Sequence, residues 1–368
     1  MIYLDYNATA PMRPEVVSAM AEGALLPANP SSMHALGRKA KARLESARER
    51  VAHVVSAWPN EIIFTASGSE ANNMVLRSFS DRPVLVGETE HASIFKTAQR
   101  LGGDVLPVDR NGHIDVAVLE AKLQALGRPA LLSVMLANNE TGVIQPMEPI
   151  VALAKAYQAL VHCDAVQAVG KIPVDFGLLG VDMLTLSAHK CGGPLGVGAL
   201  VVRNDLVVKP LITGGGQELG RRAGTENIVA IEGMALALEL AASLDWVAAA
   251  QMMRDASEAA LTAAAPDAVI AGANVARLPN TSCIMMPNVP SETQLMTFDL
   301  DGICVSAGSA CSSGRIEPSH VLLAMGYDQE QAGCALRMSG GWNSTADELK
   351  FFTETWKKTY MRLVKSAA

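Results

Sequence analysis

Two short apolar runs, each ending on polar residues, constrain this chain more than any other feature. The first spans 161–167 and the second spans 184–190. An apolar run of this length with a polar end is typical of a buried strand in a parallel sheet. Such sheets bind ligands at the carboxyl ends of their strands. We therefore expect Asp164 and Lys190 to project from neighbouring strand ends into one crevice.

A carboxylate and a lysine in one crevice suit the chemistry of pyridoxal phosphate. The lysine amine can form a Schiff base with this cofactor, and an anion beside the pyridinium nitrogen suits its ring. A plainer interpretation is also open, since a lone Asp or Lys at a strand end is usually a cap or a solvated rim residue. The context along the rest of the chain has to decide between the two.

Composition narrows the class of protein. The 368 residues are enough for two domains, and 49% apolar with 18% charged residues is typical of a globular chain. The formal charge of −7 argues against a nucleic-acid binder with a broad basic surface. No apolar run approaches the ~20 residues of a membrane span, and the first residues lack the pattern of a secretory leader. We therefore expect a cytoplasmic protein without nucleic-acid or membrane partners.

The cysteines point to one reactive thiol. No CxxC pair or zinc-finger spacing occurs, so no metal site is predicted. Five cysteines lie near apolar runs, where a free thiol is commonly a small buried hydrophobe. Cys311 lies instead in a run of Gly, Ser and Ala, which makes it the candidate nucleophile, provided that a cation or helix N-terminus favours its thiolate. An inert cysteine in a turn is the alternative. The other five are Cys163, Cys191, Cys283, Cys304 and Cys334.

The N-terminal part predicts a loop followed by a long helix. Residues 1–37 are rich in the Asn, Pro and Ser clusters that mark turns. Apolar residues then recur at steps of four and three, which puts them on one helix face. These residues are Ala40, Leu44, Ala47, Val51 and Val54. Basic residues of the same segment could mark an anion site, but a solvated face is the simpler interpretation. They are Lys39, Lys41, Arg43, Arg48 and Arg50.

Strand and helix then alternate, and polar residues follow several strands. Further strands are predicted at 61–65, 83–86, 130–136 and 197–202. The Gly/Ser turn at 66–73 leads into a helix, whose free N–H groups suit a phosphate, although Ser and Gly are also ordinary caps. Four useful side chains directly after apolar runs predict one shared site in a βα-alternating domain. They are His91, Asn139, Asp164 and Lys190.

The C-terminal part predicts a second, smaller domain. The polar loops at 213–218 and 221–227 should be exposed or used in function. A helical stretch at 229–264, with a break near Asp245, links to shorter elements. These are a strand near 281–286 and helices near 291–299, 317–325 and from Ala346 onward. Arg337 lies in a short apolar run, so it needs either a carboxylate ligand or an internal acidic partner.

Together the motifs resemble one family, the cysteine desulfurases, which are pyridoxal-phosphate enzymes of the class V aminotransferase group. The match covers nearly the whole chain in order. The segment Gly308-Ser309-Ala310-Cys311-Ser312-Ser313-Gly314 is similar to the subgroup with a long mobile cysteine loop, which serves iron–sulfur or nitrogenase assembly. The other motifs are Tyr3-Leu4-Asp5-Tyr6-Asn7-Ala8-Thr9, Thr89-Glu90-His91, Asn138-Asn139-Glu140-Thr141-Gly142, Asp164-Ala165-Val166-Gln167, Ser187-Ala188-His189-Lys190 and Ala335-Leu336-Arg337.

The resemblance implies a fold and an assembly. The fold class is α/β, with a mostly parallel seven-stranded sheet flanked by helices, of fold type I, and a smaller α+β C-terminal domain. Residues 15–250 would form the large cofactor-binding domain. Residues 1–14 and 251–368 would form the small domain, which carries the cysteine loop and Arg337. Relatives of this kind are homodimers, in which Thr225 would reach the phosphate bound by the partner subunit.

The resemblance also implies roles at the cofactor, pyridoxal 5'-phosphate. Lys190 would bind it through a Schiff base and move the substrate α-proton, and Asp164 would keep the pyridine nitrogen protonated. Gln167 would hydrogen-bond the phenolic oxygen, and His91 would stack on the ring and take part in proton transfer. The phosphate would be held by Gly68, Ser69, Ser187 and His189, together with Thr225.

The substrate roles follow in the same way. Asn139 and Arg337 would bind the carboxylate of L-cysteine, and Cys311 would take its sulfur as a persulfide, leaving alanine. A sulfur-acceptor or scaffold protein would then receive the sulfur, and Cys311 would contact a cluster only during such a transfer. The alternatives are a selenocysteine lyase, another lyase or aminotransferase of this class, or a non-catalytic sulfur-relay protein. Ser339-Gly340-Gly341 departs from the usual Ser-Leu-Gly, and the chain stops at Ala368, where longer relatives continue to a scaffold-binding extension.

Overall fold

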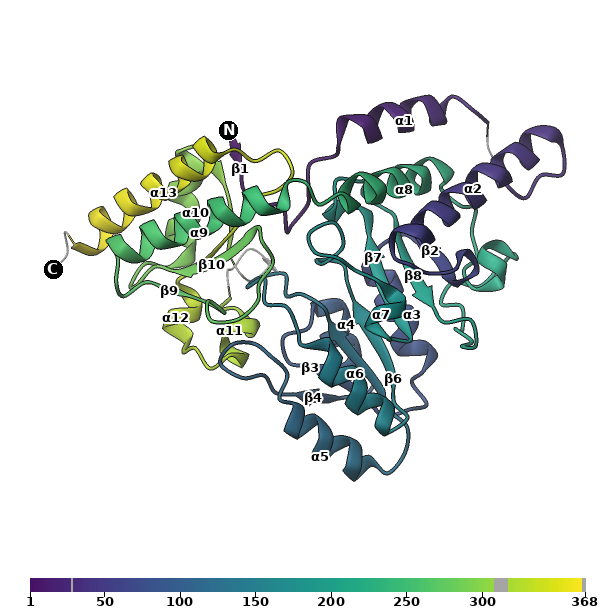
Figure 1. The fold of residues 1–368 in the computed structure, drawn as a ribbon, viewed down its shortest axis with the longest axis horizontal. Helices are drawn as coiled ribbons and strands as arrows, with labels where there is room; N and C mark the ends of the chain where they lie inside the picture. The colour runs from purple at the N-terminus through teal and green to yellow at the C-terminus, as the bar shows by residue number, and fades with distance from the viewer. Residues whose placement is uncertain (28, 308–316, 366–368) are drawn as a thin grey trace.

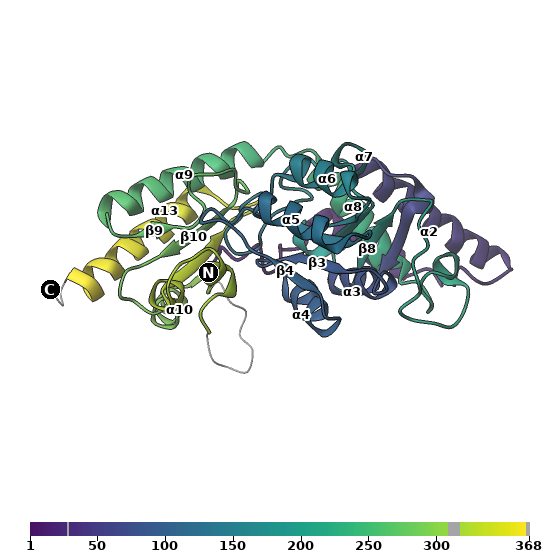
Figure 2. The same ribbon diagram turned by 90° about the horizontal axis from the view of Figure 1, so that it is seen from below.

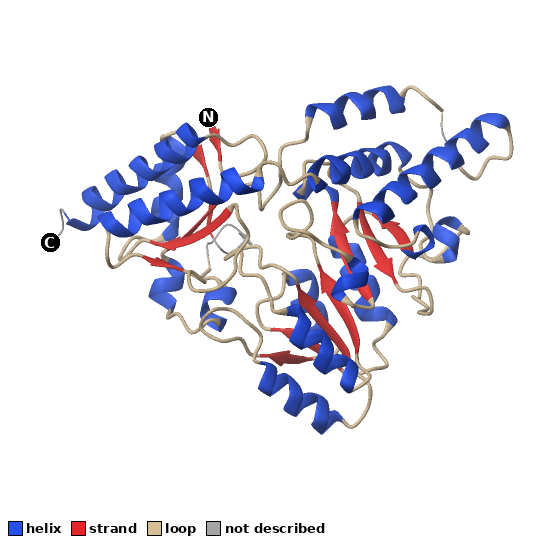
Figure 3. Ribbon diagram, in the orientation of Figure 1, coloured by secondary structure: helices blue, strands red, loops and turns tan. Residues whose placement is uncertain are grey.

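The computed structural model describes residues 1–27, 29–307 and 317–365, and its elements form two bodies (Figure 1). Each body is built on its own β-sheet with helices packed against it (Figure 3). The larger sheet has seven strands and the smaller has four. A separate pair of short strands joins the N-terminus to the smaller body.

The seven-stranded sheet has the order β2-β8-β7-β6-β5-β3-β4. Strands β4, β3, β5, β6 and β7 run parallel, whereas β8 is antiparallel to both β7 and β2. The predicted mostly parallel sheet is therefore confirmed. Its strands are β2 (Ile62–Thr65), β3 (Val84–Gly87), β4 (Asp104–Leu106), β5 (Leu131–Met135), β6 (Leu160–Asp164), β7 (Met183–Ser187) and β8 (Gly198–Val202).

Helices cover both faces of this sheet because its strands are apolar on both sides. Alternate residues of β5 divide between the faces: Leu132 and Val134 belong to one core and Leu131 to the other. The first core is covered by α2 (Ala35–Val54), α5 (Val116–Leu126), α6 (Met147–Ala156) and α8 (Ile228–Ala242). The second is covered by α3 (Gly68–Ser78) and α4 (Ala92–Arg100).

The smaller body has an antiparallel sheet of order β12-β13-β10-β9. Its strands are β9 (Val269–Ile270), β10 (Thr281–Met285), β12 (Ser306–Ala307) and β13 (Ala335–Ser339). Its core includes Phe298, Phe352 and Trp356. The helices are α9 (Val247–Ala264), α10 (Ser291–Leu300), α11 (His320–Ala324), α12 (Gln329–Gly333) and α13 (Ala346–Tyr360).

The first residues of the chain belong with the smaller body. Strand β1 (Ile2–Tyr3) pairs in parallel with β11 (Ile303–Cys304), and Leu4 is buried in the same core as Phe298. In two perpendicular views the N-terminus lies beside this body (Figures 1 and 2). Residues 2–9 are called here the N-terminal strap. The strap runs from the smaller body toward the larger sheet, and directly after it the backbone N–H of Ala10 donates to His189 O at 2.8 Å.

Two predictions about helix positions are corrected, and one is confirmed. Residues 14–24, expected to be loop, form helix α1 (Pro14–Ala24), which starts on a proline whose fixed φ suits the first helical position. The helix expected at 317–325 begins only at His320, because the Ser319 side chain caps it by accepting the N–H of Leu322. The break near Asp245 is confirmed, since α8 ends at Ala242 and α9 begins at Val247.

The basic face of α2 is the third correction. Arg48 is only 4% exposed, and its guanidinium forms two hydrogen bonds to the buried carboxylate of Glu218, at 2.8 and 2.9 Å. Arg43 and Arg50 are half-buried and pair with Glu232 and Glu239 on α8. These arginines tie α2 to its neighbours, and Lys39 and Lys41 are exposed as expected.

Most of the cysteines that the structure describes are enclosed by the protein. Four of the five are buried, and Cys304 is half-buried. The remaining short elements are the helix α7 (Phe176–Leu179), three 3-10 turns and a terminal π-helical turn at Met361–Lys365.

Within the described ranges, no helix combines the length and apolar character that crossing a bilayer requires.

Candidate active site

A cavity of about 970 Å³ lies at the carboxyl edge of the larger sheet, facing the smaller body. This size is at the upper end of small-molecule sites, which measure roughly 300–1,000 Å³. The structure brings together at this cavity the four strand-end residues predicted to share a site, since His91, Asn139, Asp164 and Lys190 all line it. The cavity lining also includes Gly68, Ser69, Gln167, Ser187, His189 and Arg337.

Of the predicted site residues that the structure describes, Thr225 is not in this cavity lining. Thr225 is exposed on the loop before α8. Cys311 lies outside the described residues. The residues on either side of the gap, Ala307 and Glu317, both line the cavity.

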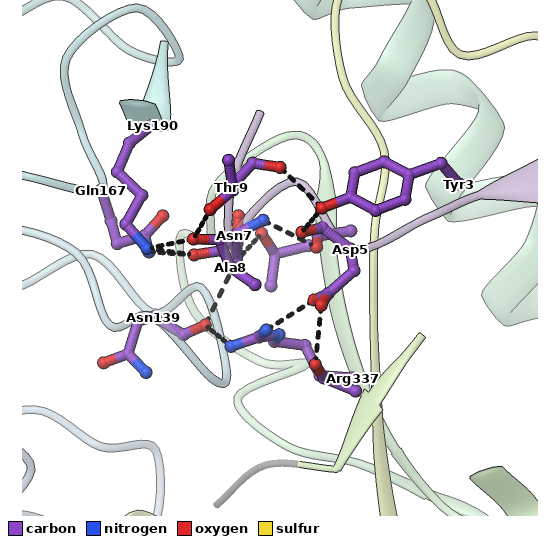
Figure 4. Close-up of polar contacts among 12 residues, drawn as sticks. Tyr3, Asp5, Asn7, Ala8, Thr9, Asn139, Gln167, Lys190 and Arg337 are labelled. Atoms are coloured by element: carbon purple, nitrogen blue, oxygen red, sulfur yellow. Dashed lines mark hydrogen bonds and ion pairs between the residues drawn. The ribbon is translucent and has the colours of Figure 1, made fainter. Parts of the chain in front are cut away.

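Lys190 ends a 3-10 turn that directly follows β7. Its Nζ donates hydrogen bonds to two backbone oxygens of the N-terminal strap, Asn7 O at 2.7 Å and Ala8 O at 2.8 Å (Figure 4). Burial, and then the nearby Arg337 cation, lower the pKa of Lys190 to about 8. A larger fraction of this lysine is therefore a neutral, nucleophilic amine near neutral pH than for an exposed lysine.

Asp164 is the last residue of β6 and is 6% exposed. Its carboxylate accepts hydrogen bonds from Asn72 Nδ2 at 2.8 Å and from the backbone N–H of Val166 at 3.0 Å. These two donors come from the start of α3 and from the turn after β6. They fix the direction of a carboxylate that a cationic ring nitrogen could approach from the cavity.

The start of α3 supplies the predicted anion-binding groups. Ser67 caps this helix, and Gly68 and Ser69 open it at the cavity wall. The neighbouring Gly198 on β8 permits this approach, because a Cβ there would lie 2.8 Å from the carbonyl carbon of Ser67. The free N–H groups and the positive end of the helix dipole therefore face the cavity.

Two histidines at the cavity have lowered pKa values. His91 lines the cavity and is accessible to solvent there, but the surrounding protein partly desolvates its ring and so lowers its pKa. Its Nδ1 accepts the backbone N–H of Ser93 at 3.1 Å. Burial, with the Lys190 and Lys171 cations, lowers the pKa of His189 to about 4. Its Nδ1 lies 3.1 Å from Thr9 Oγ1. Both rings are therefore neutral near pH 7, and the proton of the His91 ring is on Nε2.

Arg337 is the central residue of β13 and reaches the cavity from the smaller body. One of its terminal nitrogens donates to Asp5 Oδ1 at 2.6 Å and the other to Asn139 O at 3.0 Å (Figure 4). Its Nε is buried without a hydrogen-bond partner among the described residues. The internal ion pair considered from sequence is therefore present, and one N–H still lacks an acceptor.

Sequence reasoning gave no role to several polar residues around the site. Asp5 and Asn7 lie in a motif that was noted only for its resemblance, and Asn72 lies in the noted Gly/Ser turn. Lys171 was missed, although a single lysine between Val169 and Ile172 is an unusual signal in an apolar stretch. Within the described residues, no group of three or more His, Cys, Asp or Glu could hold a metal ion.

The family profile and the curated relatives that this chain matches belong to one group of proteins. Residues 2–352 match the profile of the family described as aminotransferase class-V. A cysteine desulfurase IscS from Dictyoglomus turgidum is 39% identical over 376 residues, covering 98% of this chain and 95% of its own length. A cysteine desulfurase from Cereibacter sphaeroides is 42% identical over 366 residues, with 95% and 92% of the two chains covered.

Solved structures agree with this result. A NifS-like protein from Rickettsia africae superimposes with a TM-score of 0.92 at 35% identity, covering 98% of this chain and 99% of its own. The larger sheet and the strand-end cavity described above therefore belong to a fold already seen in proteins of this kind.

Proposed function

The chain belongs to the class V aminotransferase family and, within it, to the cysteine desulfurases, and from this premise we propose that it converts L-cysteine to L-alanine with bound pyridoxal 5'-phosphate. One observation carries the proposal. The described residues that this reaction requires, among them Lys190, Asp164 and Arg337, line a single cavity.

The cavity residues fit the cofactor. Lys190 offers an amine of lowered pKa, and Asp164 offers a carboxylate already oriented by two donors. Gly68 and Ser69, with Ser187 and His189, would hold the phosphate at the start of α3. When bound, this cofactor supplies a ring that withdraws electrons from the substrate carbon next to it.

Proton transfer would be the task of Lys190 and His91. The Lys190 amine would take the α-proton of the substrate and return it later, which a pKa of about 8 makes possible in both directions near neutral pH. His91 lies at the cavity with its Nε2 protonated and would stack on the ring and donate from that nitrogen. Gln167 would donate its amide N–H to the ring oxygen.

The substrate carboxylate would bind to Arg337 and Asn139. The unpartnered Nε of Arg337 supports this assignment, because a buried N–H without an acceptor is costly and an incoming carboxylate would satisfy it. The Asp5 carboxylate holds the same guanidinium from the other side. Arg337 is thus oriented before the substrate arrives.

Sulfur transfer would be the task of Cys311. Its thiolate would attack the substrate sulfur, the carbon–sulfur bond would break with its electron pair going to carbon, and that carbon would take up a proton to give alanine. A persulfide would remain on Cys311 until an acceptor protein, for iron–sulfur cluster or other thio-cofactor synthesis, removes the sulfur. The cavity-lining positions of Ala307 and Glu317 support this role.

We extend the proposal to assembly, domains and compartment. The protein would act as a cytoplasmic homodimer, in which the exposed Thr225 reaches the cofactor phosphate of the partner subunit. Residues 15–250 would form the large domain and residues 1–14 with 251–368 the small one. The separate cores of the two sheets, and the burial of Leu4 with Phe298, support this division.

The test is the formation of alanine and sulfide from L-cysteine by the purified protein in the presence of a thiol reductant, with Cys311→Ala run beside it. Equal amounts of both products from the wild type, and neither from the variant, are expected. Cofactor absorbance should be unchanged in Cys311→Ala. Turnover of L-cysteine by the variant at the wild-type rate would refute the persulfide step.

The same assay separates the alternatives. A yellow protein that makes no sulfide from cysteine but releases selenide from selenocysteine would be a selenocysteine lyase. A yellow protein inactive with both would be another lyase or aminotransferase of the class. A protein that binds no cofactor would be a non-catalytic relay. Substrate choice is supported by a similar protein, SspA, whose structure is described as a complex with cysteine (TM-score 0.79, 30% identity, covering 92% of this chain and 98% of its own).

A further inference from the structure

Lys171 is a buried lysine directly behind the cavity. It is 2% exposed, and no carboxylate of the described residues lies within ion-pair distance of its Nζ. Gly170 precedes Lys171 and has a φ of +77°, which is in the left-handed region. A Cβ at Gly170 would lie 2.7 Å from the Cβ of Ala241, so the turn requires glycine. A lysine buried at this cost, with no carboxylate, needs an explanation other than charge pairing.

The contacts of Lys171 are two amide oxygens. Its Nζ donates to Gln167 Oε1 at 2.5 Å and to Asn7 Oδ1 at 2.8 Å. An ammonium has three N–H bonds and no lone pair, and a neutral amine still has two N–H bonds. Both protonation states can therefore hold two oxygens at once. Without Lys171, Gln167 Oε1 would lose this donor, and Asn7 Oδ1 would keep only the long contact from Asn280 Nδ2 at 3.5 Å.

The other ends of the two amides are fixed as a result. Gln167 Nε2 points the opposite way and donates to Asn7 O at 2.9 Å. Asn7 Nδ2 donates to Thr281 Oγ1 at 2.9 Å and to Asn139 O at 3.2 Å. Lys190 Nζ also donates to Asn7 O, at 2.7 Å (Figure 4). The amide N–H of Gln167 and the amine of Lys190 thus converge on one oxygen of the N-terminal strap.

We propose that Lys171 is a positioning residue, which holds Gln167 so that its amide nitrogen, and not its oxygen, faces the cofactor ring oxygen beside Lys190. The inference rests on the proposed function, because it needs the cofactor to bind at Lys190. A rotated Gln167 would turn its oxygen toward an electron-rich ring oxygen and repel it. Lys171 is not among the residues that line the cavity, so it would act on the cofactor through Gln167.

The experiment is a double-mutant cycle read by visible absorbance. The pH titration of the cofactor band reports the protonation of the Lys190 nitrogen after it has joined the cofactor. A donor on the neighbouring ring oxygen stabilises negative charge there and makes that proton easier to lose. Lys171→Met and Gln167→Met should each raise the titration midpoint by about one pH unit, the size expected for one hydrogen bond to a charged group. The exposed Lys155→Met is the matched control and should leave it unchanged.

The double variant separates positioning from direct electrostatics. If Lys171 acts through Gln167, then Lys171→Met in a Gln167→Met background adds no further shift. Additive shifts would overturn the proposal, because they would mean that the Lys171 cation acts on the site by its own charge. A wild-type midpoint in folded Lys171→Met would overturn it as well.

A second variant covers the case in which Lys171→Met does not fold, as judged by its thermal midpoint. Lys171→Gln keeps an N–H donor but cannot reach both oxygens, so it should raise the titration midpoint by less than one unit. A wild-type midpoint in Lys171→Gln would then overturn the inference. If the wild-type protein itself binds no cofactor, the proposed function fails, which is a distinct outcome from unshifted midpoints in a yellow protein.

Discussion

The two sheets supply the site in different ways. The larger sheet contributes side chains that follow its parallel strands, such as Asp164 at the end of β6 and Lys190 after β7. The smaller sheet contributes Arg337 from the middle of β13, where it is paired on both sides with β10 and β12. The first sheet thus presents residues from strand ends and the turns after them, and the second presents one residue from the middle of a strand.

Some site residues of the larger sheet are held by near neighbours in the chain, although Lys190 is held from a distance, by Asn7 O and Ala8 O. Asp164 is oriented partly by Val166, and His91 by Ser93, each two residues away. Arg337 is oriented by Asp5, 332 residues away, and by Asn139, 198 residues away. We propose a division of labour in which the larger sheet retains the cofactor, and Arg337 of the smaller sheet recognises the substrate together with Asn139 of the larger body. Three experiments can break or sharpen this comparison.

The largest effect is expected for Lys190→Ala. The variant should lose the visible band of the cofactor linkage and all detectable desulfuration, because the amine that forms the linkage is removed. Among the described residues, the cavity lining contains one other lysine, Lys96 on α4. Absorbance spectra and sulfide release measure both losses. The exposed Lys155→Ala should behave as the wild type. An unchanged visible spectrum in Lys190→Ala would mean that the cofactor lysine is misassigned.

A smaller effect, confined to the substrate, is expected for Arg337→Ala. The loss of charge-assisted hydrogen bonds to the carboxylate should raise the KM for L-cysteine on the order of 10- to 100-fold. The visible band should remain, since the cofactor residues lie on the other sheet. Arg337→Lys keeps the charge without the planar fork and should fall in between. Loss of the cofactor from Arg337→Ala would break the division of labour, and an unchanged KM would make the arginine structural.

The smallest effect concerns pH and links the two sheets. Cofactor capture by the cofactor-free protein needs the neutral Lys190 amine, and the pKa of Lys190 is lowered to about 8. The capture rate should therefore rise by about fivefold between pH 7 and pH 8, nearly double again by about pH 9, and level off above that. Stopped-flow absorbance measures it. Arg337 contributes to the lowering, so Arg337→Ala should move the midpoint upward. A wild-type midpoint near the ordinary lysine value of 10.5 would contradict this environment.

The sequence was sufficient for the parts of the site that depend on local pattern. The apolar runs before Asp164 and Lys190 predicted neighbouring parallel strands, and the register of β6 against β7 confirms it. The Gly/Ser turn at 66–73 predicted the start of α3 at the cavity. In these places the strand or helix is short, and the residues that define it lie next to one another.

The sequence was insufficient where contacts join distant segments. Arg48 lies on a face of α2 that carries many charges, and nothing local shows that Glu218 reaches it from 170 residues away. Asn7 contacts Lys171, Thr281 and Asn139, which lie in three separate segments of the chain. A periodic pattern contains no information about such pairings, so these polar networks appear only in the folded structure.

The N-terminal strap sets the order in which a newly made chain can acquire its site. The strap is synthesised before the segments that it contacts, and the backbone N–H of Asn7 donates to Ser339 Oγ, 332 residues later. The seven-stranded sheet ends at Val202 and can fold before that partner exists. Until Ser339 has been made, the strap oxygens that accept from Lys190 therefore lack the contact with β13 that helps to fix Asn7. The strap, and Lys190 with it, can be held by the full set of contacts only after the smaller sheet has formed.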